Sequence, residues 1–143
     1  KYAVRMLDLI HTVDTVKLAV EIDKQAQKAG KIQEVLIQVN ISAEATKSGV
    51  SEAQAESLLQ AISQLEHLRI KGLMTMPPYF NDPEAARPFF RALRKLRDRL
   101  EASAVPGVEL GELSMGMTGD FEAAIAEGAT LVRIGTAIFG ARQ

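Results

Sequence analysis

The sequence predicts an α/β fold of the (β/α)8 TIM-type barrel class, with about the last five strand–helix units present. Short apolar segments alternate with amphipathic stretches along the whole chain, and this alternation specifies a parallel sheet covered by helices. The units repeat at roughly 30 residues, which is typical of strand–helix repeats. Polar and glycine-rich residues follow the ends of the predicted strands, where barrel proteins build their sites.

Five segments are predicted to be strands because they are short, apolar and rich in β-branched residues. The second is nearly continuous in apolar residues, as expected for a parallel strand that is buried on both faces. The segments are Leu7–Val13, Glu34–Asn40, Leu68–Met76, Glu109–Ser114 and Thr130–Gly135.

Helices are expected between the strands, over residues 15–30, 51–65, 82–100 and 120–127, with a terminal helical turn over 136–139. Asp14-Thr15 and Ser51–Gln54 offer N-caps for the first two helices, and Asp82-Pro83 opens the third with proline at an early helical position. Gly30 and Gly128 are the expected C-terminal stops. The third helix is rich in arginine, and we interpret these arginines as a solvated face balanced by neighbouring acids.

Composition excludes several classes of protein. The 143 residues carry 17 basic and 18 acidic side chains and no cysteine, so the basic excess of a nucleic-acid or membrane-surface binder is lacking. Disulfide, thiolate and zinc–thiolate chemistry are excluded as well. No apolar run has the length of a membrane span. We expect one domain over residues 1–143, a cytoplasmic location and no metal site. Because the chain starts at Lys1 in structured sequence, we also expect the natural protein to extend further N-terminally.

Two strand-to-helix loops form the strongest candidate site. The first runs from Ser114 to Asp120 and the second from Arg133 to Thr136. Glycine lets the backbone approach an anion, and main-chain N–H groups and hydroxyls can bind phosphate oxygens. In barrels, the loops after the last two strands recurrently bind phosphate. A single loop of this type is more often an ordinary turn. Two such loops after consecutive final strands make a phosphate site about as probable as two ordinary turns.

Several single residues near the predicted strand ends have either a structural role or a role in the site. Arg133 lies in an apolar strand, and its charge requires solvent, an acidic partner or a ligand. His11 and Asn40 lie where a barrel would present them to its site. Taken singly, each is more often structural. Met76 and Met115 are flexible apolar residues that suit a core or a pocket wall.

Several motifs together resemble the pyridoxal phosphate homeostasis proteins, which are similar to the N-terminal barrel of bacterial alanine racemase, fold type III of the enzymes that use pyridoxal 5'-phosphate (PLP). The resemblance covers the whole chain and is most specific over residues 113–125 and 132–140. It also includes His11–Asp14, Val39–Ser42, Lys47–Gly49 and Gly72–Met76.

The resemblance implies PLP as the bound cofactor and suggests a role for each site residue. Ser114, Thr118 and backbone groups near Met115 would hold the phosphate from one side, and Gly135 and Thr136 from the other. Arg133 would face the pyridine nitrogen. A cation there disfavours protonation of that nitrogen and weakens the ring as an electron sink. Asn40, Met76 and His11 would line the ring.

The same resemblance places the Schiff-base lysine on the first barrel strand, in a segment before Lys1. The implied function is a PLP carrier or buffer without assigned catalysis, and no catalytic residue is expected. Two alternatives stay open: a PLP-dependent amino-acid racemase-like enzyme, and a barrel fragment that binds another phosphate ester. A second copy of the chain or an N-terminal fragment is an expected partner, because a partial barrel leaves open sheet edges.

Overall fold

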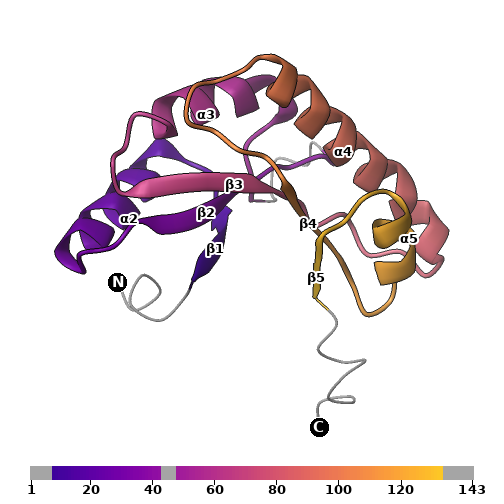
Figure 1. The fold of residues 1–143 in the computed structure, drawn as a ribbon. Coiled ribbons are helices and arrows are strands. Elements are labelled where there is room, and N and C mark those ends of the chain that lie inside the picture. Colours follow the sequence, from indigo (N-terminus) through magenta and orange to yellow (C-terminus); the bar gives the residue numbers. More distant parts are fainter. Residues whose placement is uncertain (1–7, 43–47, 134–143) are drawn as a thin grey trace, which may run out of the picture.

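The computed structural model describes residues 8–42 and 48–133 and confirms the predicted alternation of strands and helices. Five strands form one sheet in the order β1-β2-β3-β4-β5, and every neighbouring pair is parallel. The strands are β1 Leu9–Val13, β2 Gln33–Gln38, β3 Leu68–Met74, β4 Glu112–Met117 and β5 Leu131–Arg133. The sheet curls into an open half-barrel (Figure 1). Because all five strands are parallel, their carboxyl ends lie along one rim of it.

Helices connect consecutive strands, and those labelled α3 and α4 lie over the convex side of the curled sheet (Figure 1). The helices are α2 Val16–Lys28, α3 Ala55–Ile62, α4 Arg87–Ala102 and α5 Phe121–Ala126, with short 3-10 turns at η1 Glu52–Gln54 and η2 Pro83–Ala86. The expected N-caps are confirmed at Thr15 and Ser51, and Asp82 caps the turn that opens the third predicted helix. Thr15, Ser51 and Asp82 each accept a hydrogen bond from a main-chain N–H in the first turn.

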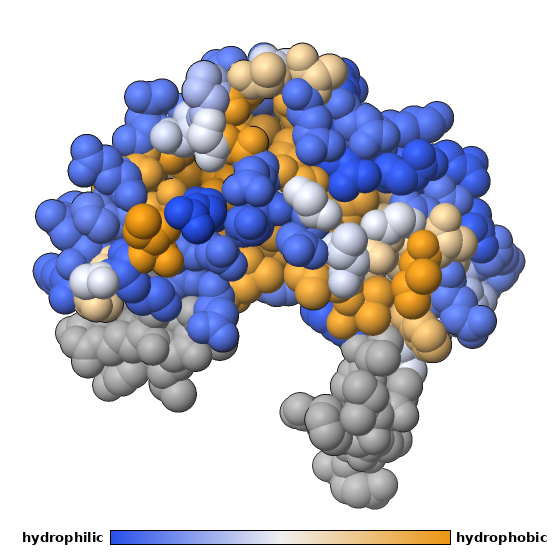
Figure 2. All heavy atoms as spheres, in the orientation of Figure 1, coloured by the Kyte–Doolittle hydropathy of each residue, from blue (hydrophilic) through white to orange (hydrophobic). Residues whose placement is uncertain are grey.

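The hydrophobic core lies between the sheet and its helices. Along β4, Leu113 and Met115 are fully buried in this core, whereas Ser114 points to the opposite, concave face. The predicted apolar stripe of α4 is buried as well, with Phe90, Leu93, Leu96 and Leu100 at 2% exposure or less. Figure 2 shows hydrophobic residues reaching the surface of the half-barrel between hydrophilic ones.

The boundaries of β4 differ from the sequence prediction. The expected strand Glu109–Ser114 begins and ends about three residues too early, because the observed strand runs from Glu112 to Met117. Ser114 and Met115 therefore lie inside the strand and not in the loop that follows it. Gly116, taken for a loop residue, is a strand residue with φ +101°, and a Cβ there would lie 2.6 Å from the Cβ of Ala124. Because of this close contact, α5 packs directly against β4.

Two other expectations concern strand ends. His11 was expected near the end of the first strand, and it lies in the middle of β1. The predicted end of the last strand and the helical turn over 136–139 fall outside the described residues. Within the described residues, no helix has the length and apolar character needed to cross a membrane.

Candidate functional site

A polar cluster on the concave face joins residues of β1, β4 and β5 and the residue that follows β3. Arg133 on β5 donates from Nη1 to the hydroxyl oxygen of Ser114 on β4, at 3.0 Å. Its Nη2 donates to the main-chain carbonyl oxygen of Thr75, just after β3, at 3.4 Å. The Nδ1 atom of His11 on β1 lies 2.9 Å from the same Ser114 hydroxyl. Ser114 thus bridges a guanidinium and an imidazole that are 122 residues apart in sequence.

The hydrogen-bond pattern assigns the state of His11. Burial, and then the nearby charge of Arg133, lower the pKa of His11 below 6.5, so the imidazole is neutral at neutral pH. Because Ser114 accepts a hydrogen bond from Arg133, its own proton is available to Nδ1 of His11. By this logic the proton of the neutral ring is on Nε2.

The charge of Arg133 is balanced by no ion pair among the described residues. Burial lowers the pKa of Arg133, and the nearby carboxylate of Asp120 partly offsets this effect. An arginine stays protonated even after such a change. The concave face therefore presents a fixed, half-buried cation, and this is the group that can lie beside a neutral heterocyclic nitrogen or an anion.

The turn between β4 and α5 differs from the expected anion cradle. The carboxylate of Asp120 accepts a hydrogen bond from the main-chain N–H of Met117 at 2.7 Å, and the N–H of Asp120 donates to the carbonyl oxygen of Met117 at 3.1 Å. The Met117 N–H is therefore used within the turn. Among the donors of this turn, the Met117 N–H is therefore not free to bind a phosphate.

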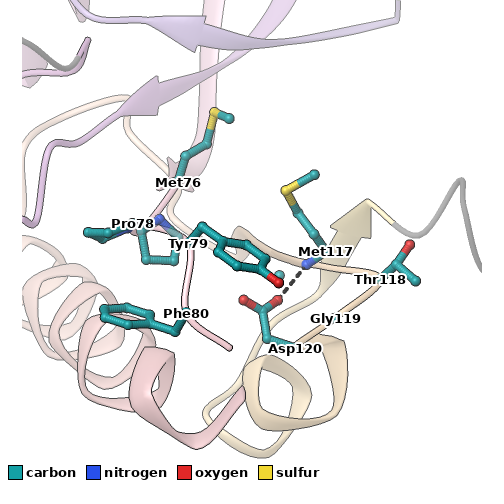
Figure 3. A pocket seen from close by; sticks show the side chains of 10 residues that line it. Met76, Pro78, Tyr79, Phe80, Met117, Thr118, Gly119 and Asp120 are labelled. Carbon is teal, nitrogen blue, oxygen red and sulfur yellow. Dashed lines mark hydrogen bonds between the residues drawn. The ribbon is translucent and has the colours of Figure 1, made fainter. Parts of the chain in front are cut away.

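A small pocket opens beside this turn, between it and the segment that follows β3. Its volume is about 250 Å³. Figure 3 shows Met76 and Met117 at one end and Phe80 and Asp120 at the other, with Tyr79 between them. Met76, Met117 and Tyr79 are exposed by 47%, 51% and 88%. An apolar patch at the rim of the sheet thus adjoins a single carboxylate.

Helix α5, which follows the turn, is held to α4 by a buried carboxylate. Glu127 is 8% exposed and forms ion pairs with Arg87, Arg91 and Arg94 at 3.1 to 3.2 Å. Hydrogen bonds, first from Arg91 and then from Arg87 and Arg94, hold the pKa of Glu127 at about 2. The expected solvated face of α4 is therefore only part of the account: the side chains of Arg91 and Arg94 remain 46% and 36% exposed, but both also bind the carboxylate at the end of α5.

The structure brings some predicted site residues together and separates others. His11, Ser114 and Arg133 form one cluster, and Met76 and Thr118 line the pocket. The Oδ1 atom of Asn40 accepts a hydrogen bond from the Ser42 hydroxyl at 2.9 Å. The side chain of Met115 is buried in the core, so only its backbone could serve the site. Gly135 and Thr136 lie outside the described residues.

Sequence reasoning missed three residues. The Thr75 carbonyl supports Arg133, and no side-chain pattern reveals a main-chain acceptor. Asp120 was expected only as the end of the first loop and the start of a helix, and its hydrogen bond to the Met117 N–H was not foreseen. Tyr79 follows two prolines, and a large aromatic residue in such a loop was the signal that could have identified it. In the part of the chain that is described, no group of three or more acidic or histidine side chains could hold a metal ion.

The chain matches a known family and is similar to proteins with a solved structure. The model of the family described as alanine racemase, N-terminal domain, matches residues 1–143. The chain is 48% identical over 143 residues to the pyridoxal phosphate homeostasis protein of Aquifex aeolicus, covering all of this chain and 62% of that protein. It is 47% identical over 136 residues to the protein of the same name from Vibrio alginolyticus, covering 95% of this chain and 57% of that protein.

A solved structure agrees with this assignment. PipY of Synechococcus elongatus, solved with PLP bound, superposes with a TM-score of 0.86 at 35% identity, covering 96% of this chain and 63% of that one. The half-barrel is therefore the alanine-racemase-like fold. The chain spans about three-fifths of the length of the curated relatives given above.

Proposed function

Because the chain belongs to the alanine racemase N-terminal domain family, we propose that it binds PLP on the concave face of its sheet. The function is that of a carrier or buffer in PLP homeostasis, without catalysis of its own. The observation that carries the proposal is the half-buried guanidinium of Arg133, held by Ser114 and by the Thr75 carbonyl. The PLP-bound structure of PipY and the names of the two relatives support it.

Each residue is assigned a role that follows from its position. Arg133 faces the pyridine nitrogen, and His11 lines the ring from the opposite edge of the cluster. Thr118 and the backbone near Met115 contact the phosphate, together with Gly135 and Thr136. Ser114 contributes to the phosphate site only if it gives up one of its present partners, so we assign it first to positioning Arg133. Asn40 and Met76 border the ring.

The chemistry of the site favours binding of PLP over catalysis with it. PLP supplies a reactive aldehyde and an aromatic ring that accepts electrons. A permanent cation beside the pyridine nitrogen disfavours its protonation, and the ring then stabilises a carbanion poorly. Neutral His11 adds no second positive charge. These residues therefore bind and orient the ring without providing strong electron withdrawal.

In this proposal, chain outside the described residues completes the barrel. Strands β1 and β5 are the edges of the described sheet, and unpaired edges need a cover. A segment like the extra length of the relatives, or a second copy, would provide it. The family resemblance places the Schiff-base lysine on such a segment. Among the described lysines, Lys17, Lys24 and Lys28 lie on α2, and Lys71 pairs with Glu109. We also propose a cytoplasmic location.

A PLP titration followed by absorbance tests the function. We expect saturable binding, and we expect Arg133→Ala to weaken it by about tenfold or more, since a hydrogen bond to a charged group is lost. Arg69→Ala, at an exposed position on β3, is the matched control and should bind as the parent chain does. Equal affinity of Arg133→Ala and Arg69→Ala, or no saturable binding at all, would overturn the proposal.

A further inference from the structure

Two sequence motifs to which the proposed function gives only part of a role meet in the structure. Asp14 ends the segment His11–Asp14, and Gly49 ends the segment Lys47–Gly49. The main-chain N–H of Gly49 donates to Oδ2 of Asp14 at 2.9 Å, although the two residues are 35 positions apart. Asp14 directly follows β1, and Gly49 lies beside the end of β2. The hydrogen bond therefore ties together the carboxyl ends of two neighbouring strands.

The segment that Asp14 holds continues the sheet beyond the end of β1. The pairing of β1 with β2 reaches only as far as Ile37. Beyond that point, the N–H of Val50 donates to the Gln38 carbonyl oxygen at 2.9 Å, and the Val50 carbonyl oxygen accepts the Asn40 N–H at 2.8 Å. The N–H of Val39, between them, donates to β3, so Val50 lies on the side of β2 where β1 has ended. Val50 therefore fixes the main chain of Asn40.

Gly49 also contacts Asn40 directly. Its φ is +117°, and a Cβ there would lie 2.7 Å from the main-chain nitrogen of Asn40. Only glycine fits this contact without displacement of the main chain. Because Asp14 holds the N–H of Gly49, and Gly49 and its neighbour Val50 both contact Asn40, the carboxylate of Asp14 controls where Asn40 lies.

A local role for Asp14 is the alternative, because a carboxylate just before a helix stabilises the helix N-terminus. Helix α2, however, already has its N-cap, since the Thr15 hydroxyl accepts the Leu18 N–H at 3.0 Å. The hydrogen bond of Asp14 runs instead to another strand–helix unit. This long-range contact favours a role at the rim of the sheet.

We propose that Asp14 is a positioning residue of the PLP site, whose carboxylate fixes Gly49 and Val50 and so places Asn40 at the ring. This role rests on the proposed function. Asp14 also lies only three residues after His11, so one carboxylate relates the two strand ends that carry His11 and Asn40. A binding site depends on how well such supporting residues hold the groups that contact the ligand.

Amide hydrogen exchange of the PLP-free chain, measured by 1H–15N NMR, tests the contact itself. In Asp14→Ala, Gly49 loses its acceptor, and we expect the amides of Gly49, Val50 and Asn40 to exchange about tenfold faster. Asp14→Asn keeps an oxygen that can accept the N–H, so it should retain most of the protection.

The role in binding is tested by PLP titrations followed by absorbance. We expect Asp14→Ala to bind PLP about fivefold more weakly than the parent chain, and Asp14→Asn to recover most of the affinity. Asp23→Ala is the matched control, because the Asp23 carboxylate accepts the main-chain N–H of His67 at 2.8 Å. That hydrogen bond is of the same kind but lies at the amino end of β3, so Asp23→Ala should bind PLP as the parent does.

Gly49→Ala tests the same role without altering Asp14. The added Cβ displaces Gly49 from Asn40, so PLP affinity should again fall about fivefold. Gly107→Ala is its control and should not change the affinity, because Gly107 also has a positive φ, +77°, but a Cβ there meets nothing within 4 Å. If Asp14→Ala does not fold, this pair of variants decides.

Three results would overturn the proposal: unchanged exchange of the Asn40 amide in Asp14→Ala, PLP affinity of Asp14→Ala equal to that of the parent chain, or equal losses of affinity in Asp14→Ala and Asp23→Ala. Failure of the proposed function is distinguishable, because the parent chain would then show no saturable binding or no effect of Arg133→Ala. The exchange measurement needs no PLP, so it judges the contact between Asp14 and Gly49 separately.

Discussion

The guanidinium of Arg133 is 3.0 Å from the hydroxyl oxygen of Ser114, and the same oxygen lies 2.9 Å from Nδ1 of His11. One buried hydroxyl therefore orients both groups that the proposed function assigns to the cofactor ring. The serine is fully buried, so no bulk water replaces its hydrogen bonds if the hydroxyl is removed. The consequences of that removal are the first prediction.

Ser114→Ala should weaken PLP binding by about tenfold, because Arg133 loses a hydrogen bond that holds it in place and a bond to a charged group contributes about 1.5–3 kcal/mol. An absorbance titration measures the dissociation constant. Ser63→Ala is the matched control, because the Ser63 hydroxyl donates to the Gln60 carbonyl on the exposed surface. Equal affinities of the two variants would show that Ser114 does not position Arg133.

His11 should make the stability of the chain depend on pH. Its pKa is lowered below 6.5 in the folded chain, first by burial and then by Arg133. The unfolded chain therefore binds more protons as the pH falls below about 6.5, so folding loses stability until the folded pKa is passed. In urea melts between pH 7.5 and pH 5, His11→Asn should show a smaller loss of stability than the parent chain. Parallel pH profiles for the two chains would contradict the prediction.

Glu127→Gln should lower the free energy of unfolding by about 2 kcal/mol, because three arginines lose a charged acceptor. Glu101→Gln, on the exposed side of α4 where Glu101 pairs with Arg97, is the control and should change it little. Since the pKa of Glu127 is about 2, its contribution is complete above about pH 4.5 and is lost as the pH falls toward 2. Urea midpoints at pH 7 and pH 3 measure both effects, and a Glu127→Gln deficit that is equal at the two pH values would contradict the assignment.

Gly72→Ala should destabilise the fold strongly, by about 3 kcal/mol. A Cβ at Gly72 would lie 1.9 Å from the carbonyl oxygen of Glu112, which is backbone of the paired strand β4. Gly111→Ala is the control, because a Cβ there meets nothing within 4 Å. Circular dichroism during urea unfolding compares the two variants. Similar midpoints would mean that β3 and β4 are further apart than described.

The strand and helix order could be predicted because local signals agree with the global fold. Thr15 and Ser51 cap helix starts where N-caps were expected, Asp82 caps the start of the third predicted helix, and the apolar segments form strands of one sheet. These signals depend on residues close together in sequence. Each cap accepts a hydrogen bond from an N–H within the first turn, and an apolar segment needs only a sheet that is covered by helices.

The end of β4 could not be predicted, because Gly116 is used for a close contact. A glycine followed by methionine, threonine and a second glycine suggests a loop. Gly116 instead stays in the strand so that Ala124 of α5 can approach it. The contact joins two elements, and nothing in the residues around Gly116 indicates which partner takes the space.

The partners of the charged residues could not be predicted from the sequence either. Arg87, Arg91 and Arg94 lie on one face of α4, but their common partner Glu127 is 33 to 40 residues away. Likewise, Arg133 was identified as a candidate from its apolar surroundings, whereas its support by the Thr75 carbonyl required the fold. The roles proposed for Gly135 and Thr136 stay predictions.

The most direct test of the central claim is PLP binding with and without borohydride reduction, followed by mass spectrometry of the chain. We predict reversible binding of one PLP that depends on Arg133, and no stoichiometric reduced adduct on any lysine of residues 1–143. The same assay on the chain extended by the preceding segment of a relative should give the adduct. A stoichiometric adduct on residues 1–143 that persists in Arg133→Ala would contradict the account, because a lysine of this chain would then anchor the cofactor away from the proposed site.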